Sequence, residues 1–512
     1  MADWYVVRRL KLLEQKFFCR ELHMSTTHLN QKDMWVGGKR VACEAGVAPL
    51  VSVNPATGAT NYEVAAAGAA TADLAVRSAA DAASSKEWSA MLPMQRARIL
   101  FRIADLIERD GEVLARHQML ENGKVWRECT MQVKSAAATF RYYGAVCETT
   151  GSEVTPSRGA YLSMTVYEPY GVVAAITPWN SPMTMEAQKI APALAAGNAV
   201  VLKPSEVTPS TGLELGRIAL EAGLPPGILN VLPGRGGEVG AALVSHALVG
   251  MVSFTGGTES GRRIAEVAAR RLMPVALELG GKSPHIVFDD AEIEAAAAAV
   301  ADGIFEGTGQ SCVAGSRLFI QRGVYAKVMR LLIERAKSLK VNLPDLQGAE
   351  MGPLATFAHR DRVESMVAEA VAQGAEILVG GARPKDAALA KGAFYLPTIV
   401  GGIDHTASIA QQEVFGPVLC ALPFDDEEDL LTQANGTAFG LASGVWTADF
   451  NRAWRVARAL QAGTVWVNTY KQLSIATPFG GFKDSGLGRE KGISGMRLYQ
   501  QAKGIYFGLN GK

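Results

Sequence analysis

The sequence lacks the features that define several classes of protein. Among its 512 residues there are six cysteines and no C-x-x-C pair, which argues against a zinc knuckle and a disulfide framework and favours a reducing, cytoplasmic compartment. No apolar run approaches the roughly 20 residues that a membrane span requires. The 51 Lys and Arg residues balance 50 Asp and Glu residues, so no charge excess predicts binding to nucleic acid or to an anionic membrane. A small-molecule partner is therefore expected.

The composition that remains is typical of a large soluble α/β protein. Hydrophobic residues make up 48% of the chain, charged residues 20%, and 53 glycines supply tight turns. The chain is long enough for two or three domains. Residues 1–30 mix charges of both signs and carry no motif, so they are predicted to be a disordered N-terminal extension. They contain too many acids for a typical organelle transit peptide, and removal of residues 1–23 is expected to leave activity unaffected.

Residues 171–270 alternate between predicted strands and predicted helices. The predicted strands are apolar runs at 172–176, 199–202, 228–231 and 251–254. The predicted helices lie near 184–196, 209–222 and 237–245, and after 260. Repeated strand–helix units form a parallel sheet covered by helices, with ligands at the carboxyl ends of the strands. A second α/β region is predicted after Pro274.

Two segments outside these regions predict exposed strands. Residues 161–167 alternate in polarity, and residues 504–509 form an apolar terminal run. Because a lone strand exposes unpaired backbone groups, the terminal strand needs a partner. That partner is either the 152–169 segment or another subunit.

The segment F-E-G-T-G-Q-S-C, which ends at Cys312, has the strongest chemical character. A nucleophilic cysteine needs partial exposure, free backbone N–H groups and room for a substrate, and the neighbouring glycines leave that room. Taken alone, a single intracellular cysteine among small residues is more often an inert packing residue.

A glycine-containing loop at 254–261 follows a predicted strand and opens a predicted helix. Its glycines are Gly256, Gly257 and Gly261. Backbone N–H groups and the helix dipole at such a place can bind a pyrophosphate, although the loop does not follow G-x-G-x-x-G and a plain turn is an alternative. Lys203 and Glu206 follow another predicted strand, where they could bind a ribose diol or be ordinary surface charges.

Glu278 is the only acid in the apolar run 275–279, and a double glycine follows it. Burial would raise the pKa of its carboxyl group toward the value that a general base needs near neutrality. A capped structural glutamate is the alternative interpretation.

Together, these segments resemble the NAD(P)-dependent aldehyde dehydrogenase superfamily. The stretch ending at Cys312 matches the F-x-x-x-G-Q-x-C signature of that family, residues 278–284 match E-L-G-G-K-[SN]-P, and Glu278 and Cys312 lie 34 residues apart. Further matches lie at 176–182, 203–206, 254–261, 413–417 and 478–486. The resemblance covers about 31–508, which is nearly the whole chain.

The resemblance implies a role for each matched residue. Cys312 is the expected nucleophile, Asn180 and the backbone N–H of Cys312 form the expected oxyanion hole, and Glu278 is the expected base. The expected cofactor-binding residues are Trp179, Lys203, Glu206, Gly256, Gly257, Gly261, Glu413 and Phe415. No metal is expected.

The resemblance also implies the fold. We expect an α/β protein with a Rossmann-type parallel-sheet cofactor domain at 31–151 and 170–278, and a second α/β catalytic domain at 279–482. A small β element for oligomerisation is expected at 152–169 and 483–512. Relatives with this architecture are commonly oligomers, so a homodimer or homotetramer is expected.

The expected reaction is oxidation of an aldehyde to the carboxylic acid with NAD, or alternatively NADP, as the cofactor. It proceeds through a thiohemiacetal and a thioester on Cys312, and the thioester is hydrolysed and not passed to coenzyme A. Two alternatives stay open: a cysteine hydrolase or acyltransferase without a redox step, and a non-catalytic protein on the same fold.

Several residues depart from the family pattern. Ser181 stands where many members have an aromatic residue, Gly257 stands where others have serine, and Ser311 and Val313 flank the cysteine. These changes reshape the pocket and leave aromatic, cyclic and aliphatic aldehydes open. No cluster of arginines for a second carboxylate is evident, which favours a neutral aldehyde.

Overall fold

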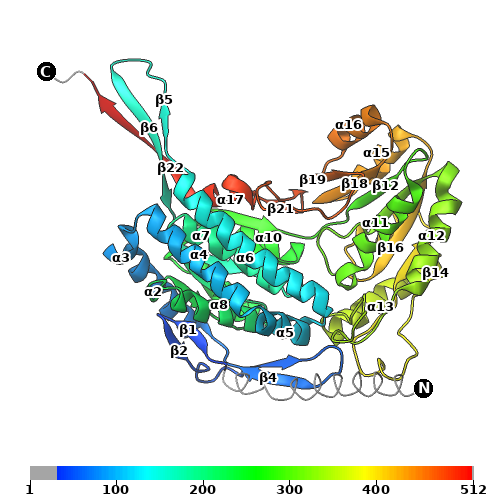
Figure 1. Cartoon of the computed structure of the whole chain (residues 1–512), viewed down its shortest axis with the longest axis horizontal. Helices are drawn as coiled ribbons and strands as arrows, with labels where there is room; N and C mark the ends of the chain where they lie inside the picture. Colours follow the sequence, from blue (N-terminus) through cyan, green and yellow to red (C-terminus); the bar gives the residue numbers. More distant parts are fainter. Residues whose placement is uncertain (1–31, 510–512) are drawn as a thin grey trace, which may run out of the picture.

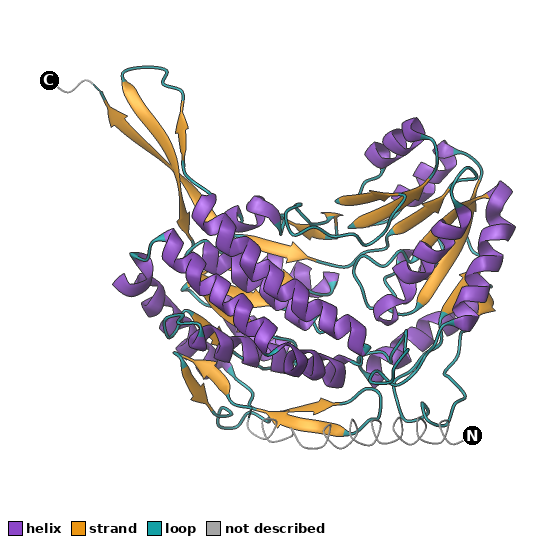
Figure 2. Ribbon diagram, viewed as in Figure 1, coloured by secondary structure: helices purple, strands orange, loops and turns teal. Residues whose placement is uncertain are grey.

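The computed structural model describes residues 32–509, which form two α/β units and a projecting sheet of three strands (Figure 1). In both units, helices pack against the faces of a central sheet (Figure 2). The predicted extension at 1–30 lies outside the described residues. None of the helices described between residues 32 and 509 is long and apolar enough to span a bilayer.

Within the described residues, a mostly parallel sheet of eight strands forms the first unit. The strand order is β2 (Lys39–Val41), β1 (Met34–Val36), β9 (Leu229–Val231), β8 (Ala199–Lys203), β7 (Val172–Ile176), β10 (Val249–Thr255), β11 (Val275–Glu278) and β21 (Gly486–Leu487). Strands β9 to β11 run parallel, and β1, β2 and β21 join through antiparallel pairs. Every residue of β7 and β8 is buried, as expected where helices cover both faces of a sheet.

Helices cover both faces of the first sheet. One face carries α4 (Pro93–Arg109), α5 (Gly111–Asn122), α6 (Trp126–Thr149), α7 (Pro182–Ala195) and α8 (Ser210–Glu221). The other face carries α2 (Ala69–Ser84), α9 (Ala241–Ser245) and α10 (Thr258–Ala269), and α3 (Lys86–Ser89) follows α2. The strands and helices predicted for 171–270 are confirmed, with the difference that Gly236–Gly240 forms a π-helical turn ahead of α9.

The strand order reverses between β7 and β10. From β7 the chain moves outward through β8 and β9, and it then returns to form β10 and β11 on the other side of β7. At such a reversal the loops at the carboxyl ends of the strands leave toward opposite faces, which opens a crevice for ligands. The crevice lies just beyond Ile176 and Phe254, which are paired across the two strands.

The second unit contains a sheet of seven described strands. Their order is β14 (Glu376–Val379), β15 (Thr398–Gly401), β16 (Val418–Phe424), β13 (Arg317–Gln321), β12 (Pro284–Val287), β18 (Ala442–Trp446) and β19 (Thr464–Val467). Its helices are α11 (Ile293–Phe305), α12 (Tyr325–Ser338), α13 (Phe357–Ala372), α14 (Ser408–Gln411), α15 (Glu427–Asn435) and α16 (Phe450–Ala459). Because β12 follows β11 after residues 279–283, those residues lie at the junction of the two units.

The projecting sheet consists of β5 (Glu153–Thr155), β6 (Tyr161–Pro169) and β22 (Gln500–Gly508), and it extends away from both units (Figure 1). Strand β22 pairs with β6 along its whole length. The terminal strand therefore finds its partner in the 152–169 segment of its own chain. Residues 483–499 lie outside this sheet and include β21 and α17 (Gly492–Arg497). The predicted domain boundaries stay a prediction.

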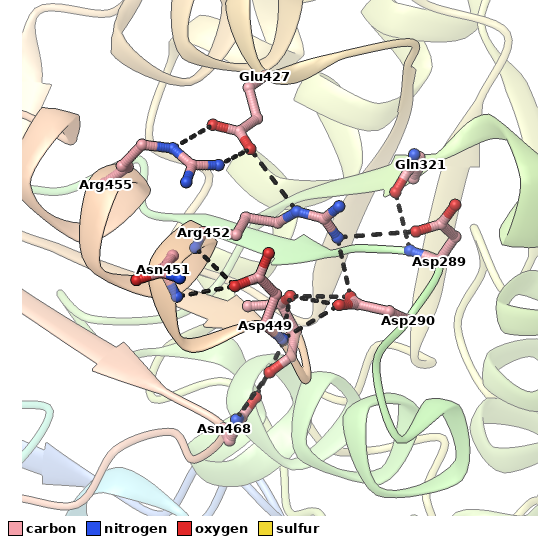
Figure 3. Close-up of polar contacts among 10 residues, drawn as sticks. Asp289, Asp290, Gln321, Glu427, Asp449, Asn451, Arg452, Arg455 and Asn468 are labelled. Atoms are coloured by element: carbon pink, nitrogen blue, oxygen red, sulfur yellow. Dashed lines mark hydrogen bonds and ion pairs between the residues drawn. The ribbon is translucent and has the colours of Figure 1, made fainter.

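A polar network holds the turn after β19 (Figure 3). The Asn468 side chain accepts a hydrogen bond from the Thr447 N–H at 3.1 Å and donates one to the Thr447 carbonyl at 2.9 Å. The Thr447 hydroxyl donates to Asp290 at 2.8 Å, and Arg452 pairs with Asp290 at 3.0 Å and with Glu427 at 3.6 Å. These contacts fix the start of the loop at 468–481, which runs from β19 to the short pair β20 (Phe482–Lys483) and β17 (Phe439–Gly440).

Candidate active site

Cys312 is half-buried in a loop that follows α11 and the 3₁₀ turn Glu306–Gly309. The turn contains left-handed backbone at Gly307, Thr308 and Gly309, with φ angles of 67°, 58° and 70°. Added atoms at Gly309 would collide with the carbonyl of Gly416, so a glycine is required there. The cysteine loop consequently packs directly against the segment that follows Glu413.

Asn180 lies at the other side of the cysteine loop. Its side chain is buried, and Nδ2 donates a hydrogen bond to the Gln310 carbonyl at 3.0 Å. Gln310 is itself fixed, because its side chain accepts from the Ala355 N–H at 2.8 Å and donates to the Gly307 carbonyl at 3.2 Å. An amide nitrogen carries two N–H donors. One of them binds Gln310, which precedes Cys312 by two residues, so the second N–H of Asn180 stays available to a substrate at Cys312.

Glu278 ends β11 and is buried. Among the described residues, nothing forms a hydrogen bond with its Oε2. Burial, followed by the nearby charge of Glu490, raises the pKa of the Glu278 carboxyl well above its usual value. The backbone then turns at Gly281, where an added Cβ would lie 2.5 Å from the Cys312 carbonyl. Glu278, Asn180 and Cys312 therefore meet at the junction of the two units.

The pKa of the Cys312 thiol is raised to about 12 by burial and by the carboxylates of Glu278 and Glu413. The thiol is therefore protonated at neutral pH, and it needs a base or an approaching electrophile before it can act as a thiolate.

A buried ion pair behind Glu278 was not predicted from the sequence. Lys189 of α7 and Glu490 are 2.7 Å apart and almost fully buried, and Lys189 also donates to the Ser253 hydroxyl at 3.1 Å. Lys189 lowers the pKa of Glu278, although its effect is smaller than those of burial and of Glu490. The sequence signal for Lys189 is its place, with Glu186, as one of two ionisable residues in the largely apolar helix α7, and Glu490 lies just beyond the matched segment 478–486.

The predicted glycine loop lies at the carboxyl end of β10, beside the crevice. Gly257 is the N-terminal cap of α10, and an added Cβ there would meet no atom within 4 Å. Gly256 donates its N–H to the Glu278 carbonyl at 3.0 Å, and Gly261 packs tightly on the side chain of Leu279. The first turn of α10 therefore faces open space with free backbone donors, as an anion site requires.

Lys203 and Glu206 lie together at the carboxyl end of β8. Lys203 is buried, Glu206 is half-exposed, and the Lys203 Nζ lies 2.9 Å from the Glu206 Oε2. Burial alone would raise the pKa of Glu206, but the attraction of Lys203 outweighs that effect and holds the pKa below its usual value. The carboxylate is therefore ionised at neutral pH.

Glu413, Phe415 and Trp179 form the wall between the crevice and Cys312. Glu413 accepts a hydrogen bond from the Gly281 N–H at 3.0 Å, and burial raises the pKa of its carboxyl to about 7. The rings of Trp179 and Phe415 meet edge to face, with centroids 5.4 Å apart. Phe415 has a φ angle of 56°, and its carbonyl lies 2.7 Å from the His359 Nε2. Strained backbone of this kind clusters at functional sites.

Two threonines at the crevice were also missed from the sequence. Thr177 follows β7 and Thr255 ends β10, and among the described residues neither buried hydroxyl has a hydrogen-bond partner. Unpartnered buried hydroxyls are costly, so their presence at the strand reversal fits a polar ligand. A threonine at a strand end carries no distinctive sequence signal.

These groups suit an enzyme that oxidises its substrate while holding it on a cysteine, with a dinucleotide in the neighbouring crevice. The chain belongs to the aldehyde dehydrogenase family, whose family model matches residues 44–505. It is an NAD(P)-dependent aldehyde dehydrogenase, as the sequence predicted. The alternatives of a non-redox cysteine enzyme and of a non-catalytic protein are thereby set aside.

Named relatives cover nearly the whole chain. A betaine aldehyde dehydrogenase from Brucella melitensis is 40% identical over 474 residues, which is 92% of this chain and 96% of the relative. A betaine aldehyde dehydrogenase structure from Staphylococcus aureus in complex with NAD+ superposes with a TM-score of 0.93 at 37% identity, covering 96% of this chain and 97% of the other. The structure of PnpE in complex with nicotinamide adenine dinucleotide superposes with a TM-score of 0.92 at 40% identity. The match covers 94% of this chain and 98% of PnpE. The expected fold class and cofactor are confirmed.

Proposed function

We propose that Cys312, Asn180 and Glu278 carry out the oxidation of an aldehyde to its carboxylic acid. The Cys312 sulfur attacks the aldehyde carbon and forms a thiohemiacetal. The oxygen that becomes negative is stabilised by the free N–H of Asn180 and by the backbone N–H of Cys312. The observation that carries this proposal is the hydrogen bond from Asn180 to the Gln310 carbonyl, because it holds the amide beside Cys312 before any substrate arrives.

Glu278 has the role of general base in this proposal. After the thiohemiacetal is oxidised, the thioester on Cys312 has to be hydrolysed. The unpartnered Oε2 of Glu278 can accept a proton from the attacking water, and its raised pKa makes the deprotonated carboxylate a stronger base than an exposed glutamate. The buried ion pair of Lys189 with Glu490 fixes the electrostatic surroundings of the base.

The crevice residues fit a dinucleotide. Lys203 and Glu206 would hold the adenosine ribose, Gly256 and Gly257 at the start of α10 would bind the pyrophosphate, and Glu413 would hold the nicotinamide ribose. Gly261 would serve by letting α10 pack on Leu279, and Trp179 and Phe415 would shape the wall. NAD, when bound, supplies the acceptor for the hydride that leaves the substrate carbon.

The test of the reaction is reduction of NAD, followed at the near-ultraviolet absorbance of NADH across a panel of aldehydes. At least one aldehyde is expected to give steady NADH formation and a free acid product without coenzyme A. A protein that reduces no NAD with any aldehyde, or that needs coenzyme A for turnover, would contradict the proposal.

We predict a preference for NAD over NADP. The ionised Glu206 would accept a hydrogen bond from a ribose 2′-hydroxyl but repel a 2′-phosphate. A preference in kcat/KM on the order of 10-fold is expected, since the carboxylate is half-exposed. Replacement of Glu206 with Gln should narrow the preference. Better use of NADP than of NAD by the parent enzyme would refute the assignment of Glu206.

We predict that the protein is a homodimer or a homotetramer. The projecting sheet exposes large apolar side chains, namely Val154, Tyr506, Phe507 and Leu509, and its outer strands offer unpaired backbone groups to a second copy. Light scattering at micromolar concentration should report a dimer or tetramer, and replacement of Phe507 with Lys should shift the protein toward the monomer. A stable and active monomer of the parent protein would show the prediction to be wrong.

A further inference from the structure

Lys491 is a buried cation beside Cys312 that the proposed mechanism does not use. Only 6% of Lys491 is exposed. Among residues 32–509, no ion pair and no hydrogen bond to its ammonium group is formed. A buried charge without a counter-ion is costly. The backbone of Lys491 is also left-handed, with a φ angle of 62°, which a lysine adopts only at a cost. Both costs point to a functional use of the side chain.

The ammonium group of Lys491 lies over an aromatic ring that belongs to the surroundings of Cys312. Its Nζ lies 4.9 Å from the centroid of the Phe479 ring. Phe479 belongs to the apolar cluster that packs against Cys312, together with Val313 and Trp466. Burial lowers the pKa of Lys491, and the nearby charges of Glu490, Cys312 and Glu278 oppose that effect in part. Lys491 in turn lowers the pKa of the Cys312 thiol, so the two groups are close enough to interact. The cation and the nucleophile therefore lie against the same apolar cluster.

The acidic groups near Lys491 do not form ion pairs with it. Glu490 is already paired with Lys189 at 2.7 Å. Burial and the charge of Glu490 raise the pKa of the Glu278 carboxyl well above its usual value, and Glu278 forms no ion pair with Lys491. The Cys312 thiol, with a pKa of about 12, carries no charge at neutral pH. Among the described residues, Lys491 consequently has no ion-pair partner of its own.

A second lysine near Cys312 is less available. Lys471, on the loop at 468–481, lies close enough for Cys312 to affect its pKa. Its Nζ, however, donates to the Asp302 carbonyl at 3.4 Å, and Lys471 is more exposed than Lys491. Lys491 is therefore the better binding group for an anion inside the pocket.

We propose that Lys491 binds a negatively charged group of the substrate, so that the preferred substrate is an aldehyde that also carries a carboxylate. This inference rests on the proposed function of Cys312. The substrate class would be the semialdehydes of dicarboxylic acids, in place of the neutral aldehydes that the lack of an arginine cluster suggested. Nothing in the sequence around Lys491 predicted that this lysine would be buried near Cys312.

The first test compares matched aldehydes with and without a carboxylate, such as succinic semialdehyde with butanal and glutaric semialdehyde with pentanal. The parent enzyme is expected to prefer the charged member of a pair by on the order of 10- to 100-fold in kcat/KM, the effect of one charge-assisted contact. Replacement of Lys491 with Met should remove most of that ratio. The matched control is Lys483→Met, because Lys483 has a similar φ angle of 51° but donates to the Asn435 and Thr437 carbonyls outside the pocket.

Three outcomes of this test would overturn the inference. The parent enzyme could prefer the neutral aldehydes, in which case aldehyde oxidation stands and the substrate class is wrong. The preference in kcat/KM for the charged aldehyde could survive in Lys491→Met, or it could be lost in Lys471→Met instead. Either result would mean that a residue other than Lys491 binds the anion.

The second test does not depend on the redox reaction. Iodoacetate and iodoacetamide both alkylate a thiolate with loss of iodide, and they differ by one negative charge. The rate of Cys312 modification, followed by peptide mass spectrometry, should show a ratio of iodoacetate to iodoacetamide that falls about 10-fold or more in Lys491→Met. Equal slowing of both reagents would mean that Lys491 tunes the thiol and does not bind an anion. Either result is readable even if no aldehyde is oxidised.

Discussion

Glu278→Gln is expected to change steady NADH formation into a single burst followed by slow turnover. Glutamine keeps the shape of the side chain but cannot take a proton from water, so hydrolysis of the thioester on Cys312 should slow by on the order of 10²- to 10⁴-fold. Formation of the thioester should suffer less. The burst, measured by rapid mixing, should equal the concentration of active sites.

The pH dependence of this variant provides an independent check. In the parent enzyme the base form of Glu278 is populated only as the pH rises through its raised pKa, so deacylation should increase with pH over that range. The variant should lack this rise. The matched control is Glu186→Gln on α7, because Glu186 is equally buried and unpartnered among the described residues but lies outside the site. Parent-like turnover in Glu278→Gln would end the assignment of Glu278 as the base.

Cys312→Ala should give neither burst nor steady turnover. The variant has no atom that can attack the aldehyde, so no thiohemiacetal forms and no hydride becomes available. We expect loss of activity to the detection limit, while NAD still raises the melting temperature because the crevice residues are untouched.

The control for this variant is Cys43→Ala. Cys43 is also half-buried, but it lies far from the site and its Sγ donates to the Val47 carbonyl. It should keep the parent activity and should still lose it on alkylation of Cys312. Turnover by Cys312→Ala at a rate near that of the parent would exclude Cys312 as the nucleophile.

Much of the first unit could be predicted from the sequence. The apolar runs that form β7, β8, β9 and β10 and the periodic helices between them are local patterns, and burial on both faces of the sheet leaves few other ways to arrange them. The sequence predicted ligands at the carboxyl ends of the strands, but the order of the strands, which puts the crevice between β7 and β10, came from the structure.

The candidate site residues that the sequence predicted share a property. Cys312, Glu278 and the glycines at 256, 257 and 261 sit within short segments whose composition is unusual, so the pattern is visible along a few residues. Their meeting at one point could be expected only through the resemblance to a family. The structure supplied the physical reason, which is close backbone contact at Gly281 and Gly309.

By itself, the sequence determined the family and the parallel-sheet architecture and supplied candidates for the chemistry, because these depend on local composition and on the periodicity of apolar residues. Only the tertiary structure decided which distant charges meet. Lys189 and Glu490 are separated by 301 residues and yet form a buried ion pair, and Lys491 becomes a buried cation beside Cys312. Whether a lysine is solvated or buried depends on what packs around it, and that packing is a property of the whole fold.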